Sequence, residues 1–155
     1  KGMFVSHQGV SLCCVNHDKY KGIKPSEFWE GDVRKDALSN MSGEREVKGC
    51  DGCYKTESKK MPSSRTFANG YDALPVKKFP TMLDIDLSNF CNLKCVMCGS
   101  TRSSEWAKDI GLPVSSVSQD IIDDLANVSE DLQHLTIQGG EPTNNKCHKR
   151  KQTIL

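Results

Sequence analysis

Two short segments with alternating or continuous apolar residues decide the fold of this chain: residues 82–88, MLDIDLS, and residues 134–138, HLTIQ. Both have the composition of strands, and the residues between them carry helical patterns at 103–111 and 119–128. A strand, two crossover helices and a second strand predict a parallel βαβ unit, so we expect an α/β fold. The loops that follow the two strands should then meet at the carboxyl edge of the sheet, where α/β proteins build active sites.

The loop after the first of these strands carries three cysteines, Cys91, Cys95 and Cys98. Three closely spaced thiolates suit a [4Fe–4S] cluster whose fourth iron has no protein ligand and remains open to another molecule. A zinc loop is the alternative, with Cys147 or His148 as the fourth ligand.

The residues CNLKCVMC at 91–98 and the turn Gly139-Gly140-Glu141-Pro142 together resemble the two motifs of radical S-adenosylmethionine (SAM) enzymes. The resemblance implies a partial (β/α) barrel, a [4Fe–4S] cluster whose open iron binds SAM, and a turn that contacts the methionyl amino group. It also implies reductive cleavage of SAM to a 5′-deoxyadenosyl radical. Met97 stands where the family often has an aromatic residue and would offer an apolar contact to the adenine. The resemblance assigns no catalytic residue in this chain.

The amino-terminal cysteines resemble a second kind of site. A predicted hairpin at residues 2–15, a predicted helix at 25–43 and the cysteines around them look like the auxiliary-cluster module called SPASM, or its shorter twitch form. The resemblance implies a second Fe–S cluster, with Cys14 as a fourth ligand or a buried neighbour of the three ligands Cys13, Cys50 and Cys53. Zinc is the alternative, bound by Cys50 and Cys53 with Cys13, Cys14 or His17.

These resemblances predict three segments: an auxiliary module at residues 1–60, a linker at 61–80 and the start of a truncated radical SAM core at 81–155. The linker should be packed by Phe67 and Tyr71. The chain opens at Lys1 and ends on a polar, basic run, so we expect a fragment.

Composition limits the partners. The net charge of +1 gives no field that would attract nucleic acid, and no apolar run reaches the roughly 18 residues of a membrane span. We therefore expect a cytoplasmic protein whose partners are SAM, an electron donor and an unidentified substrate, for which a peptide is one candidate. A non-catalytic zinc- or Fe–S-binding interaction module and an inactive truncated product are the other hypotheses.

Two features near the three-cysteine loop leave alternatives open. Trp106, in the stretch SSEW at 103–106, either matches relatives of this architecture or packs its helix against the sheet. Asp84 and Asp86 lie on one side of their strand, and that side faces either the interior of a barrel or solvent.

Overall fold

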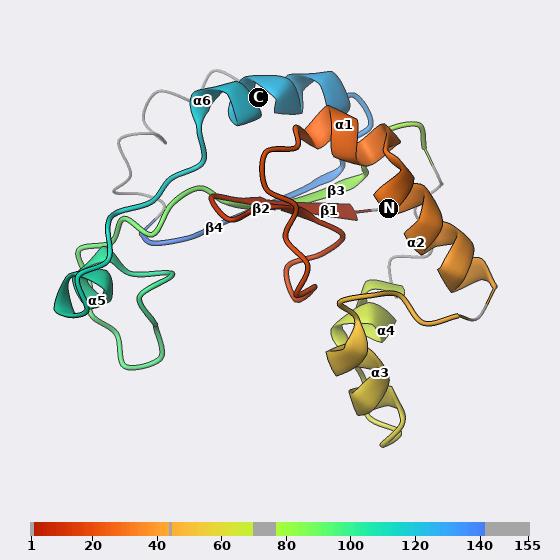
Figure 1. Cartoon of the computed structure of the whole chain (residues 1–155), viewed down its shortest axis with the longest axis horizontal. Coiled ribbons are helices and arrows are strands. Elements are labelled where there is room, and N and C mark those ends of the chain that lie inside the picture. Colours follow the sequence, from red (N-terminus) through yellow and green to blue (C-terminus); the bar gives the residue numbers. More distant parts are fainter. Residues whose placement is uncertain (1, 44, 70–76, 142–155) are drawn as a thin grey trace.

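A four-stranded mixed sheet organises the chain in the computed structural model, which describes residues 2–43, 45–69 and 77–141 (Figure 1). The strand order is β2-β1-β3-β4. The hairpin strand β2 (Gly9–Ser11) runs antiparallel to β1 (Gly2–Ser6), whereas β3 (Met82–Asp86) is parallel to β1 and β4 (His134–Gln138) is parallel to β3. The three parallel strands are in register and end together, so their following loops share one edge.

Helices lie on both sides of this sheet. Figure 1 shows α1 and α6 above the sheet, α3 and α4 below it, and α5 beyond its left end. The bounds are α1 (Pro25–Glu30), α2 (Asp32–Ser42), α3 (Asp51–Glu57), α4 (Ser64–Asn69), α5 (Ser104–Asp109) and α6 (Gln119–Leu125), which the 3-10 turn η1 (Ala126–Val128) continues.

The main core forms between the sheet and the helices α1 and α6. Alternate residues of the parallel strands supply its floor, including Met3, Val5, Leu83 and Ile85, each no more than 6% exposed. The helices cover them with large side chains such as Phe28, Trp29, Ile122 and Leu125. Burying one such side chain contributes about 1.5–3 kcal/mol to the stability of the folded state, so this layer holds the sheet and its helices together.

A buried carboxylate joins α6 to the first turn of α1. Asp124 is 8% exposed, and its two oxygens accept hydrogen bonds from the backbone N–H and the hydroxyl of Ser26, each at 2.8 Å. Burial alone would raise the pKa of Asp124, but these bonds and one from Asn127 outweigh it and hold the pKa below its usual value. The carboxylate therefore satisfies donors that α1 itself leaves unpaired.

The structure confirms the parallel βαβ unit and the helices expected between its strands. The helix expected at 25–43 is two helices, α1 and α2, because the backbone is extended at Gly31, which follows α1 and precedes α2. The segment expected as a linker contains α4, whose Phe67 is 72% exposed, and Tyr71 lies outside the described residues.

The expected boundary between an amino-terminal module and a later core is crossed by the sheet. Because β1 pairs with β3, the predicted hairpin belongs to the same sheet as the βαβ unit. Across residues 2–43, 45–69 and 77–141, no helix has the length and apolar character needed to cross a membrane.

Removing the Asp124 carboxylate should weaken the packing of α1 against α6. We expect Asp124→Ala to lower the free energy of unfolding by about 1–3 kcal/mol, because the donors of Ser26 lose their buried acceptor. Urea denaturation at neutral pH measures this change. The contribution should be lost as the pH falls through the lowered pKa of Asp124, since protonation removes the charge that these donors stabilise.

The neighbouring Asp123→Ala is the matched control. Asp123 is exposed and accepts a hydrogen bond from the exposed side chain of Gln119, so its removal should change stability by no more than about 0.5 kcal/mol. Equal losses in the two variants would contradict the role given to Asp124.

Candidate functional site

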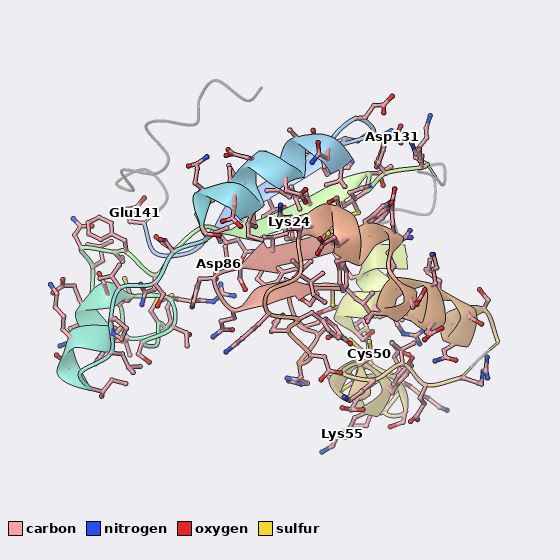
Figure 2. All side chains as sticks on the ribbon, turned by 45° about the horizontal axis from the view of Figure 1, so that its top comes forward. Lys24, Cys50, Lys55, Asp86, Asp131 and Glu141 are labelled. Carbon is pink, nitrogen blue, oxygen red and sulfur yellow. The ribbon has the colours of Figure 1, made fainter. Side chains whose placement is uncertain are left out.

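Two loops meet at the carboxyl edge of the sheet, as the sequence predicts. The three-cysteine loop, residues 89–99, follows β3, and the glycine turn, residues 139–141, follows β4. The backbone N–H of Glu141 donates to the carbonyl of Phe90 at 2.9 Å, so the glycine turn is bonded to the residue just before Cys91. In Figure 2, Asp86 and Glu141 lie on the side of the sheet where this loop and α5 are found.

The two glycines permit this contact. Gly139 and Gly140 have positive φ angles of 92° and 55°. A Cβ on Gly139 would lie 1.7 Å from Oδ1 of Asp86, and a Cβ on Gly140 would lie 2.0 Å from the carbonyl oxygen of Phe90. Both glycines are therefore required by close approach as well as by conformation.

The first turn of α5 fixes the three-cysteine loop. The Ser104 hydroxyl donates to the Cys91 carbonyl at 2.9 Å and accepts from the Cys91 N–H at 3.1 Å, while the Ser103 hydroxyl donates to the Leu93 carbonyl at 2.8 Å. The indole N–H of Trp106 donates to the Cys95 carbonyl at 2.8 Å. Trp106 thus bonds to the three-cysteine loop, and its packing of α5 against the sheet stays a prediction.

The three cysteines of this loop differ in exposure. Cys91 is 7% exposed and its Sγ accepts from the Leu93 N–H at 3.3 Å, Cys95 is exposed, and Cys98 is half-buried. Within the described part of the chain, no three cysteine, histidine or carboxylate side chains converge closely enough to hold a metal ion. The thiols have the chemistry of cluster ligands, but their sulfur atoms are not gathered around one point.

The remaining predicted residues of this site are one exposed methionine and three residues outside the described part of the chain. Met97 is 92% exposed, so its side chain is open to a ligand rather than packed in the protein. Pro142, Cys147 and His148 lie outside the described residues.

Asp86 is a buried carboxylate below the glycine turn. It is 5% exposed, and among the described residues its Oδ1 has no hydrogen-bond partner. Burial raises the pKa of Asp86, while Arg102, His7 and Lys19 act in the opposite direction. Asp84 is half-buried on the same side of β3, so neither aspartate simply faces solvent.

The second cysteine group lines a pocket of about 340 Å³, which we call the thiol pocket. Cys13, Cys50 and Cys53 all line it, as does His17. Cys50 directly precedes α3 and Cys53 lies within its first turn. Cys14 is not among the lining residues; burial raises its pKa, and Asp84 raises it further.

Burial also raises the pKa of the thiols of Cys13 and Cys50. A hydrogen bond from Asn16 partly offsets this for Cys50, and Cys53 adds to the rise. In the structure as described, these cysteines are therefore thiols that a bound metal would have to deprotonate.

Sequence reasoning missed Asn16, which joins the two halves of the thiol pocket. Asn16 is 2% exposed; its backbone N–H donates to the Cys13 carbonyl at 3.2 Å and its amide Nδ2 donates to the Lys48 carbonyl at 3.2 Å. The same amide lies 3.6 Å from Sγ of Cys50. Its position two residues after the Cys13-Cys14 pair was the available signal, since asparagine readily bonds nearby backbone.

The two cysteine groups are separate sites. Figure 1 shows α3, which carries Cys53, and α5, which follows the three-cysteine loop, near opposite ends of the molecule. In Figure 2, Cys50 and Asp86 are correspondingly far apart across the sheet. A group bound at one site would not share protein ligands with a group bound at the other.

No protein-family model, curated protein or solved structure matches this chain.

The close approach of Gly139 to Asp86 should make the fold sensitive to one added methyl group at this glycine. We expect Gly111→Ala, at φ 69° in open space, to cost about 1–2 kcal/mol from backbone strain alone. Gly139→Ala should exceed that loss by about 1–3 kcal/mol, because its Cβ also overlaps Asp86. Chemical denaturation of both variants measures the difference, and equal losses would show that the close approach is unimportant.

The buried charge of Asp86 should destabilise the fold as pH rises. Because folding raises its pKa, the carboxyl group favours the folded state most below its unfolded value of about 3.9, and this advantage is lost as the pH rises through the folded pKa. We expect Asp86→Asn to be more stable than the wild type at neutral pH, with the difference vanishing in acid. Urea denaturation of both proteins between acid and neutral pH measures this difference in stability, and Asp84→Asn is the control. A difference that does not change with pH would refute the role of the Asp86 charge.

Proposed function

We propose that this chain is the cluster-binding portion of a radical SAM enzyme. In this proposal Cys91, Cys95 and Cys98 hold a [4Fe–4S] cluster and the Gly139–Glu141 turn receives SAM beside it. The thiol pocket, lined by Cys13, Cys50 and Cys53, would hold an auxiliary metal centre. An electron donor and a substrate, for which a peptide is one candidate, complete the expected partners.

The contact between the glycine turn and Phe90 is the observation that carries the proposal. It brings two motifs separated by about forty residues to one edge of the sheet, through a hydrogen bond adjacent to Cys91. A loop that bound only zinc would need its thiolates, but it would give no reason for a turn with two sterically required glycines.

The residues divide the work of such a site among them. When bound, the reduced cluster and SAM would supply a 5′-deoxyadenosyl radical that abstracts hydrogen from the substrate. Ser103, Ser104 and Trp106 would hold the loop backbone in place, and Met97 would offer an apolar surface to the cofactor. Gathering the three sulfur atoms requires movement within the loop, for which the exposed Cys95 has the most freedom.

A zinc-binding interaction module is the second candidate, and one observation favours it. His17 lines the thiol pocket together with Cys13, Cys50 and Cys53, so one imidazole and three thiols border the same space, although no three of them converge on one point in the described structure. This is a donor set of structural zinc sites. Zinc without acid-labile sulfide in the purified protein would support this reading.

Anaerobic reconstitution with iron and sulfide tests the proposal. The wild type should gain the absorbance of cubane clusters, and SAM should change the EPR spectrum of the reduced protein. Two triple variants separate the sites, each replacing one group by serine: Cys91, Cys95 and Cys98, or Cys13, Cys50 and Cys53. Each variant should lose about half of the bound iron and sulfide, since each group would hold one cluster.

The response to SAM should be lost in the first variant alone. A SAM response that survived replacement of Cys91, Cys95 and Cys98, or a wild type without any cluster absorbance, would overturn the proposal.

A further inference from the structure

The two edges of the sheet differ in how their backbone groups are used. On the outer side of β2, Val10 and Tyr20 exchange backbone hydrogen bonds at 3.1 and 2.8 Å, so the loop after the hairpin covers that edge. The opposite edge is β4, and among residues 2–43, 45–69 and 77–141 the sheet has no strand beyond it. An edge of this kind is open to pairing with a strand of another chain.

The phase of the β3–β4 ladder decides which backbone groups of β4 face outward. The Leu87 N–H donates to the Gln138 carbonyl at 3.2 Å, so Gln138 turns its backbone groups toward β3. Because these groups alternate in direction along a strand, Leu135 and Ile137 direct their N–H and C=O groups away from β3. In the part of the chain that the structure describes, no other backbone group bonds to this outer side of Leu135 and Ile137.

The side chains of β4 lack the features that commonly protect an edge strand. The strand reads HLTIQ and contains no proline, lysine, arginine or acidic residue. Charged side chains and proline are the usual means by which proteins prevent pairing at an edge. Leu135 is 39% exposed, although its partner Leu83 in β3 belongs to the core. The exposed leucine and the free backbone groups together favour a strand as the partner of this edge.

The sequence of β4 is complementary to itself when two copies run antiparallel about Thr136. In that register, Leu135 of one copy lies opposite Ile137 of the other, and their outward N–H and C=O groups bond to each other. Both side chains lie on the face of the sheet that carries Leu83 and Ile85, which gives an apolar cross-strand pair. Thr136 lies opposite its own copy, where two threonines can share a hydrogen bond, and no like charges meet.

We propose that β4 is a self-association edge, at which two copies of this chain pair antiparallel through residues 134–138 to form one continuous sheet. The pairing places a two-fold axis at Thr136, so both copies contribute the same surface. It involves none of the cysteines and is therefore independent of the proposed clusters. Stable dimers bury about 1,200–2,000 Å², and a five-residue strand is a short contact. We therefore expect a reversible dimer whose fraction rises with protein concentration.

Sedimentation equilibrium of the full chain tests this pairing at about 1 μM to 1 mM protein, the range in which weak interfaces associate. A reductant and a chelator exclude dimers formed through disulfides or metal ions. The wild type should change from monomer to dimer within this range. Thr136→Lys should weaken the dimer at least about tenfold, because it places two like charges at the two-fold axis. In the monomer this exposed lysine would face Asp84 across the ladder, so the fold should be retained.

Two further measurements separate loss of pairing from loss of folding. Thr136→Asp should also be monomeric by itself, but mixing it with Thr136→Lys should restore the dimer, because opposite charges then meet across the axis. The matched control is Thr101→Lys, which adds the same charge at an exposed threonine in the turn before α5 and should leave the dimer unchanged.

Three results would overturn the proposal. A wild type that stays monomeric throughout would leave this edge to a strand of another protein. A dimer that Thr136→Lys does not weaken would have to form elsewhere on the molecule. A mixture of the two charged variants that stays monomeric would contradict the pairing about Thr136.

Discussion

The in-register pairing of β3 with β4 is the constraint on which the arrangement at the carboxyl edge depends. Because Asp86 faces Gln138 across the ladder, both strands end at the same level, and the chain beyond each must share the same space. Only a turn without side chains can occupy it, as the positions of Gly139 and Gly140 show. The hydrogen bond from Glu141 to Phe90 follows from this register and places the turn beside Cys91.

The sequence predicted the elements whose evidence is local. Short windows of sequence showed the alternating apolar residues of β3, the helical pattern of α6 and the strand His134–Gln138. The parallel order of the two strands follows from the crossover between them. The meeting of the two loops was predictable for the same reason, since parallel strands place their carboxyl ends at one edge.

Features that depend on distant contacts were not visible. The pairing of β1 with β3 joins residues about eighty positions apart, and nothing in the hairpin itself indicates a parallel partner. The break at Gly31 also escaped prediction, because the apolar pattern continues across it while the backbone becomes extended at this glycine. Asn16 has ordinary surroundings in sequence, and its contact with Cys50 appears only when residues 48–50 lie beside it.

The two cysteine groups share one structural device although they lie in different parts of the fold. In each, a glycine with positive φ lies where a Cβ would overlap a group beside a cysteine: the amide of Asn16 at Gly49, just before Cys50, and the backbone of Phe90 at Gly140, just before Cys91. A thiol on a flexible loop would gain metal affinity only by losing conformational freedom, so a fixed backbone beside a cysteine would reduce that cost if the cysteine bound a metal. For this reason the cysteine spacing alone does not determine the geometry of either group. The spacing supplies the sulfur atoms, but glycines outside the spacing decide where the backbone that carries them can lie.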